Sequence, residues 1–277
     1  MHITHSDLKT IIESKSPGFF QKLPGFLSNA LLWIFAQIVH ADELVEFFTL
    51  HGDKSNWQFI EAVLAYLKVS YVVTEADRQR IPATGRLICV ANHATGPLDG
   101  LILLHLIGSV RKDVKIVLTD LLAGLDNLSE LFLVYDQYAS RLQKQNIQAI
   151  RQAIRAEQAV IFFPAGEMTK LTRRGLREQT WQTGPVALAR KYGAPILPVA
   201  LHARNSWLYY LVALLHRNLS TMMLSHEMFR KRSRTIPVTI GELLPATRLT
   251  AAESDVHVQS QQLREYMHQL LGPHTFC

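Results

Sequence analysis

Apolar and polar residues follow one another along the chain in blocks that predict an α/β fold. Pro237 lacks a backbone N–H, so the strand predicted at 235–240 is expected at the edge of the sheet. Helices are predicted between most strands, and neighbouring strands are therefore expected to pair in parallel through right-handed crossovers. Short apolar runs, typical of strands buried on both faces, lie at 69–73, 87–91, 114–119, 131–136, 160–163 and 195–201.

The fold class predicted from this pattern is a mixed, mostly parallel sheet flanked by helices on both sides. Gly193 is suited to end one helix in a left-handed turn. Thr250 and Glu253 have the spacing of a capping box, which predicts the start of the last helix. Apolar periodicity, apolar composition and such end signals predict helices at 101–107, 145–157, 180–192, 207–215, 219–229 and 250–271.

The first 68 residues are predicted to be a helical extension of a domain formed by residues 69–277. Within this extension, helices are expected at 3–14, 26–39 and 57–67. The apolar segment 26–39 is shorter than the roughly 20 residues that a bilayer-spanning helix needs. It is expected either to lie in a membrane interface or to pack on the domain.

One turn carries the residue types of acid–base chemistry. His93 and Asp99 follow the strand 87–91, at the end of the sheet where ligands bind in open α/β folds. A neutral imidazole can remove a proton from a hydroxyl, and a nearby carboxylate can fix its ring and tautomer. In the alternative reading, His93 caps a helix and Asp99 places a favourable charge on its first turn.

Two further segments decide between these readings. One is a predicted strand that is followed by a turn with Pro164 and Gly166, within the segment from Val160 to Glu167. The other is a predicted strand with two prolines, from Ala194 to Leu201. Together with Asn92, His93 and Asp99, these blocks resemble the lysophospholipid and glycerolipid acyltransferase family, typified by 1-acylglycerol-3-phosphate acyltransferases. The hemolysin-like bacterial branch is the most similar, and the resemblance covers about residues 70–245. Matching positions include Trp181, Gly184, 188–191, Asn205 and Ser206.

The resemblance implies a glycerol-3-phosphate acyltransferase-like fold and an acyl transfer without metal, cofactor or covalent intermediate. His93 would remove the proton of an acceptor hydroxyl, and Asp99 would orient His93. The co-substrate would be an acyl-carrier protein or acyl-CoA thioester, and the acceptor a lyso-lipid. Backbone N–H groups near Gly166, or in the turn after Asn92, would stabilise the oxyanion. The residues expected to bind substrate are Asn92, Gly96, Pro164, Gly166, Glu167 and Lys170.

Two positions depart from the family pattern. Gln137 stands where the family has an Arg that contacts the phosphate of the acceptor. Ala165 stands in the third block where a Glu is common, and Glu167 follows two positions later. A Gln cannot replace the charge of Arg. We therefore expect a pocket for a polar headgroup that need not select lysophosphatidate, with Lys170 or Arg173 supplying positive charge.

The charge of the chain narrows the choice of partner. Lys and Arg number 29 against 23 acidic residues, the pI is about 9.4 and the mean hydropathy is +0.07. Basic clusters at 170–177 and 230–234 accompany apolar segments, which favours an anionic membrane surface, although ordinary solvated helix faces remain an alternative. Neither a zinc-finger spacing nor an RNP-like signature occurs, so we expect no nucleic-acid partner.

Cysteine content and the first residues bear on location. Cys89 lies in a predicted buried strand and Cys277 is the last residue. Two cysteines in such positions do not form a disulfide framework. The N-terminal residues lack the pattern of a secretory signal. The expected location is the cytoplasmic face of the inner membrane, as a peripheral protein.

Two rival functions remain open at the level of sequence. In a lipid ester hydrolase, the same pair of His93 and Asp99 would activate water. A non-catalytic protein that binds membrane surfaces would keep the fold and not hold substrate. No nucleophile elbow, phosphate loop or dinucleotide turn supports another chemistry.

Overall fold

The structure is a computed structural model that describes residues 25–118, 125–134, 140–172, 175–215, 217–251 and 255–272. The predicted helix at 3–14 lies outside these ranges, as do Gln137 and Arg173.

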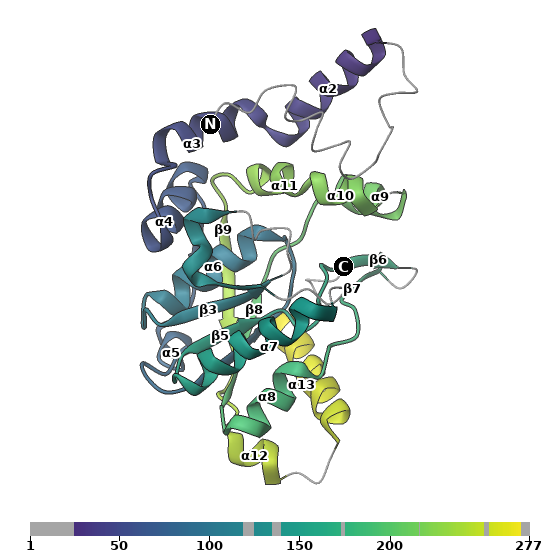
Figure 1. Ribbon diagram of the computed structural model, residues 1–277. Helices are drawn as coiled ribbons and strands as arrows, with labels where there is room; N and C mark the ends of the chain where they lie inside the picture. Colours follow the sequence, from purple (N-terminus) through teal and green to yellow (C-terminus); the bar gives the residue numbers. More distant parts are fainter. Residues whose placement is uncertain are drawn as a thin grey trace.

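A seven-stranded sheet forms the centre of the described structure (Figure 1). Its spatial order is β1-β9-β8-β2-β5-β3-β4, and each neighbouring pair is parallel except β8 with β9. The predicted mixed, mostly parallel sheet is therefore confirmed. The strands are β1 (Ser70–Val72), β2 (Leu87–Ala91), β3 (Val114–Leu118), β4 (Phe132–Val134), β5 (Ala159–Phe162), β8 (Ile196–Leu201) and β9 (Thr235–Ile240).

Helices follow most of the strands, as the alternating pattern predicts. They are α2 (Gly25–Val39), α3 (Ala41–His51), α4 (Asn56–Leu67), α5 (Glu75–Arg78), α6 (Pro97–Gly108), the 3₁₀ helix η2 (Asp126–Leu131), α7 (Ser140–Arg155), α8 (Gly184–Tyr192), α9 (Trp207–Leu215), α10 (Arg217–Met222), α11 (Leu224–Arg230), α12 (Ala246–Ala251) and α13 (Val256–Leu271).

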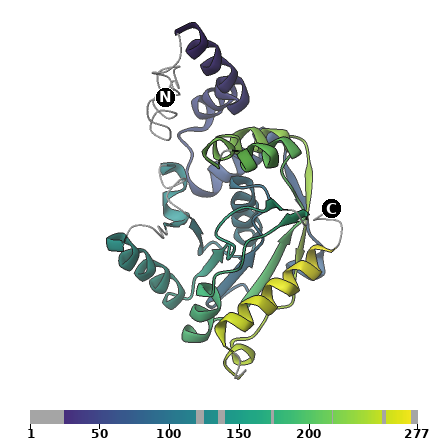
Figure 2. The ribbon, with the colours of Figure 1, turned by 90° about the vertical axis from the view of Figure 1, so that its right-hand side faces the viewer.

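The two faces of the sheet are covered by different helices. In β2, Leu87, Cys89 and Ala91 join a core that includes side chains of α4 and α6. Ile88 and Val90 point to the other face and join a core with α7, α8 and α13. Helix α13, in yellow, runs along this second face (Figure 2). Because all five residues of β2 are buried, the continuous apolar run in the sequence is explained by cover on both sides.

The prediction that residues 235–240 form an edge strand is wrong. β9 lies between β1 and β8, and the three-residue strand β1 forms the edge on this side of the sheet. Pro237 is tolerated there because it lies beyond the last pairing with β8, where its carbonyl accepts the backbone N–H of His202 at 3.0 Å. The missing N–H of Pro237 therefore falls at the margin of the ladder.

Several boundaries differ from the sequence predictions. Helix α8 begins at Gly184 rather than Thr180, and residues 178–183 form an extended segment and a turn. Helix α13 begins at Val256 after Asp255, whereas Thr250 of the predicted capping box belongs to α12. The helix α3 and the antiparallel hairpin of β6 (Lys170–Thr172) and β7 (Gly175–Arg177) were not predicted.

The described N-terminal helices pack on the rest of the structure. Phe47 of α3 and Phe59 and Ile60 of α4 belong to the same core as β2 and α6. Helix α2 contacts α11, and α9, α10 and α11 form a row between α2 and the sheet (Figure 1). None of the described helices reaches the length and apolar character that crossing a bilayer requires.

Cys89 lies in the middle of β2 as a free thiol. It is completely buried between apolar neighbours. Burial disfavours the charged thiolate and raises the pKa of Cys89 to about 12.

Candidate active site

Asn92 fixes the point at which the chain leaves β2. Its Nδ2 donates to the carbonyl of Leu201 at 3.0 Å, and its Oδ1 accepts the backbone N–H of Leu201 at 2.8 Å. The buried side chain thus joins the ends of the parallel strands β2 and β8 as a peptide group would. This places the following residue, His93, at the carboxyl end of the sheet.

His93 and Asp99 meet across the β2–α6 turn. Nδ1 of His93 lies 3.0 Å from Oδ2 of Asp99, on the first turn of α6. The same Oδ2 accepts the backbone N–H groups of Thr95 at 2.7 Å and Gly96 at 3.0 Å, and the Thr95 hydroxyl donates to Oδ1. These donors compensate a carboxylate that is 0% exposed. Asp99 therefore caps the first turn of the helix and also holds the imidazole, whereas His93 does not cap α6, whose N-cap is Gly96.

The ring of His93 is held in one orientation. It stacks on Phe163 with ring centroids 4.2 Å apart and an interplanar angle of 20°. Because the Asp99 carboxylate accepts a hydrogen bond, the Nδ1–H tautomer of His93 places the lone pair on Nε2. The side chain is 21% exposed and lines a cavity. Nε2 is thus the nitrogen with which His93 can take a proton from a ligand.

The backbone of His93 is held by the segment around the β6–β7 hairpin. Its N–H donates to Oε1 of Glu178 at 3.1 Å, and its carbonyl accepts the N–H of Thr169 at 3.0 Å. Glu178 is only 3% exposed, and burial raises the pKa of this carboxyl. Sequence reasoning missed Glu178, because a single acidic residue in a polar stretch carries no motif.

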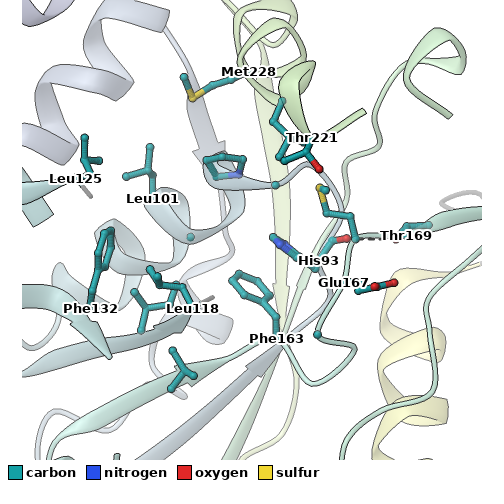
Figure 3. Close-up of a pocket in the computed structure, with 18 of the residues that line it drawn as sticks. His93, Leu101, Leu118, Leu125, Phe132, Phe163, Glu167, Thr169, Thr221 and Met228 are labelled. Carbon is teal, nitrogen blue, oxygen red and sulfur yellow. Dashed lines mark hydrogen bonds between the residues drawn. The ribbon is translucent and has the colours of Figure 1, made fainter. Parts of the chain in front are cut away.

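The cavity beside His93 has a volume of about 1130 Å³. One side is apolar and is formed by side chains of α6, β3, η2 and β4, among them Leu101, Leu118 and Phe132 (Figure 3). The opposite side carries Glu167, Thr169 and Thr221, and His93 lies between the two sides (Figure 3). Such a cavity suits a ligand with a long apolar part and a polar end.

The comparison with protein families decides what class of protein carries this site. A family model described as acyltransferase matches residues 10–270 of the chain. The chain belongs to this acyltransferase family. The family expected from the sequence motifs is thereby confirmed, and the protein is an acyltransferase.

Curated relatives and one solved structure are similar to the acyltransferase. A lyso-glycine lipid O-acyltransferase of Bacteroides thetaiotaomicron is 26% identical over 246 residues, covering 86% of this chain and 88% of the relative. A protein of the same name from Phocaeicola vulgatus is 24% identical and covers 86% of each chain. The crystal structure of the 1-acyl-sn-glycerophosphate acyltransferase of Thermotoga maritima matches with a TM-score of 0.48 and 16% identity, covering 76% of this chain and 78% of that one.

The structure brings most of the predicted site residues of the acyltransferase to one cavity. Those that line it, besides His93, are Gly96, Pro164, Gly166, Glu167 and Lys170. Asp99 and Asn92 lie behind His93 and act on it or on the strand end. For Asn92, both polar atoms of the amide are engaged with Leu201.

Two glycines of the acyltransferase have backbone conformations that disfavour side chains. Gly96 has φ +93°, and a Cβ there would approach Leu224 to 3.1 Å and Met168 to 3.2 Å. Gly166 has φ +66°, and a Cβ would lie 2.9 Å from Gln182. Both glycines therefore permit tight turns directly beside the cavity.

Several of the backbone N–H groups near the predicted oxyanion site already donate hydrogen bonds within the protein. The N–H of Gly166 donates to the carbonyl of Phe163 at 2.9 Å, and those of Thr95 and Gly96 donate to Asp99. These three groups are therefore used within the turns. An oxyanion donor would have to come from the other backbone N–H groups of the same turns.

Glu167 and Lys170 form an ion pair at the polar side of the cavity. The side chain of Lys170 is 46% exposed and that of Glu167 is 29% exposed. Exposed pairs of this kind contribute little to stability. Both charges are thus presented to the cavity without being required by the fold. Within the described ranges, no group of three His, Cys, Asp or Glu side chains is placed to hold a metal ion.

Proposed function

We propose that the protein transfers a fatty acyl group from a thioester, either acyl-carrier protein or acyl-CoA, to a hydroxyl of a lyso-lipid. His93 acts as the general base and Asp99 orients it. The observation that carries this proposal is the 3.0 Å contact of His93 Nδ1 with buried Asp99, beside a large cavity with an apolar side. The names of the two relatives support a lyso-lipid acceptor.

In the proposed reaction, Nε2 of His93 takes the proton of the acceptor hydroxyl as its oxygen attacks the thioester carbonyl. The tetrahedral oxyanion then collapses, a C–O bond remains and the C–S bond breaks. The proton on the imidazolium passes to the leaving thiolate, so His93 is neutral again at the end. Asp99 stabilises the imidazolium while it exists. Each backbone donor aimed at the oxyanion contributes ~3 kcal/mol.

The two sides of the cavity suggest how such substrates bind. An acyl chain fits against Leu101, Leu118 and Phe132, and a polar headgroup against Glu167 and Lys170. Because Gln137 and Ala165 replace the residues of the phosphate pattern, we propose a lyso-lipid with a polar headgroup of the lyso-glycine lipid kind, rather than lysophosphatidate.

The proposed membrane partner is supported by helix α9. Leu208, Leu211 and Leu215 are 54%, 53% and 85% exposed, although the helix contains no charged residue. Its other side, with Tyr209 and Tyr210, lines the cavity. An apolar helix between cavity and exterior suits a peripheral position on a lipid surface. Cations lie at the borders of α9, among them Arg204 just before the helix and Lys170 on β6, which packs on α9. These cations would attract anionic lipids and an acidic carrier protein.

The proposal is tested by incubating the purified protein with acyl-carrier-protein or acyl-CoA thioester, with and without lyso-lipid. We expect thiol release only when the acceptor is present, and one acylated lipid for each thiol. Lyso-glycine lipid and lysophosphatidate are supplied in parallel, and the former is expected to react faster. Release of fatty acid from a lipid ester without thioester would instead identify a hydrolase. Binding to vesicles without any turnover would identify a non-catalytic protein.

A further inference from the structure

A second buried carboxylate, Glu178, holds the backbone of the proposed base. Glu178 follows β7 and is 3% exposed, so its charge requires hydrogen-bond donors. Oε1 accepts the backbone N–H of His93 at 3.1 Å, and Oε2 accepts the indole N–H of Trp181 at 3.1 Å. Each carboxylate oxygen therefore has one neutral donor, and one of the two belongs to the proposed base.

The charged groups around Glu178 come from two elements. Arg264 on α13 donates to the backbone carbonyl of Glu178 at 2.9 Å and attracts its carboxylate. His93 is the other group whose charge acts on it. Burial is the largest influence and raises the pKa of Glu178, while the two hydrogen bonds and these charges oppose the increase.

Asp99 and Glu178 thus hold different parts of the same residue. Asp99 holds the imidazole ring, whereas Glu178 holds the peptide N–H from which the side chain projects. We propose that Glu178 is a positioning residue for acyl transfer, which fixes the backbone of His93 and places a second negative charge near its ring. This inference rests on the proposed function of His93 as the general base.

The consequence is that the base is anchored by two segments distant in sequence. The β2–α6 turn supplies His93 and Asp99, and the residues after the β6–β7 hairpin supply Glu178. The hairpin segment also holds the His93 carbonyl through Thr169 and carries Lys170 at the cavity. The hairpin segment therefore helps to hold His93 and also contributes to the polar side of the cavity.

The test is steady-state kinetics of Glu178→Gln over a range of pH. The amide keeps the size and an acceptor oxygen but removes the charge. We expect kcat to fall about tenfold, because a charge-assisted hydrogen bond is weakened, while KM for the acceptor changes less than twofold. The midpoint of the acidic limb of the pH profile is expected to move to lower pH, since loss of a nearby negative charge favours neutral imidazole.

A second variant predicts a smaller shift of the same sign. Trp181→Phe keeps a ring in the core but removes the donor to Oε2, so Glu178 takes up its proton at higher pH. Because a protonated Glu178 places no negative charge near His93, the acidic limb is expected to move to lower pH, by less than in Glu178→Gln. Because this variant retains Glu178, it decides the question even where Glu178→Gln does not fold.

Glu227→Gln is the matched control. Glu227 is also fully buried and accepts the backbone N–H of Ser206 at 2.8 Å, but it does not contact His93. We expect a lower melting temperature and an unchanged acidic limb. Equal shifts in Glu227→Gln and Glu178→Gln, or an unchanged kcat and limb in Glu178→Gln, would overturn the inference. Full activity of His93→Ala would instead overturn the proposed function itself.

Discussion

The β2–α6 turn and helix α9 face the same cavity, yet they are built in opposite ways. In the turn, Asp99 is completely buried and has four hydrogen-bond contacts, while His93 is held at its ring and its backbone. In α9, Trp207, Leu211 and Leu215 expose more than half of their surface. The polar groups of the turn are thus satisfied within the protein, whereas the side of α9 that carries these three residues is left uncovered by the part of the chain that the structure describes.

Under the proposed function, the turn carries out acyl transfer and the exposed side of α9 contacts the lipid surface. A preorganised polar site does not need to reorganise when charge develops on the imidazole. Exposed apolar side chains instead gain free energy only when a partner covers them, at about 25 cal/mol per Å². The comparison predicts that changes in the turn lower the rate of transfer, and that changes in α9 lower the binding to lipid.

Removal of His93, the proposed base, is expected to have the largest effect. His93→Ala should lower kcat about 10³-fold, because general base catalysis is lost. The melting temperature should change little, since the side chain is partly exposed and lies at a cavity. The measurement is acyl transfer followed by mass spectrometry of the lipid, with a thermal melt as control. A rate of acyl transfer within threefold of the wild type would contradict the assignment of the chemistry to the β2–α6 turn.

Asp99→Asn should leave more activity than His93→Ala. The amide can no longer accept from every donor around it, and it permits the wrong tautomer of His93. We expect kcat to fall about 10²-fold, the lower end of what general acid–base catalysis contributes, together with some loss of stability because the Thr95 and Gly96 N–H groups lose a charged acceptor. Kinetics and a melt on one preparation measure both effects. A rate equal to that of His93→Ala would mean that the base has no function without the carboxylate.

The smallest effect is expected for the exposed side of α9, the proposed lipid contact. Leu211→Ser should weaken binding to vesicles that contain phosphatidylglycerol about fivefold, because roughly 1 kcal/mol of apolar burial is lost. Val258→Ser is the matched control, since Val258 on α13 is 47% exposed and Leu211 is 53% exposed. Co-sedimentation measures both variants. Equal losses of vesicle binding in the two variants would show that α9 contributes no more to lipid binding than an exposed residue of α13 does.

Features fixed by local pattern were predictable from the sequence. The run of five apolar residues in β2 and the turn that follows allowed the contact of His93 with Asp99 to be predicted, because only six positions separate them. The apolar helix α9 was visible as an uninterrupted run. Residues whose role depends on the neighbouring segment were not predictable in this way.

Glu178 and Pro237 illustrate that limit. Glu178 accepts a hydrogen bond from the backbone N–H of His93, although the two residues are 85 positions apart in the sequence. The path of the chain around the β6–β7 hairpin brings them together. Pro237 was expected at an edge, but it pairs with Val72 of β1 on one side of β9, and on the other side it lies beyond the last pairing with β8, so its missing N–H falls at the margin of that ladder. In both cases the deciding contact is tertiary, and composition or periodicity does not encode it.

Because Cys89 is buried in β2, the strand that leads to His93, its thiol can be used to measure the opening of that strand. A thiol with a pKa of about 12 and no exposed surface does not react with alkylating reagents while β2 stays in the sheet. Cys277 is the other cysteine of the sequence, so its replacement by Ser leaves a protein with one thiol. The rate at which Cys89 is alkylated then measures how often the central strand opens, independently of any substrate.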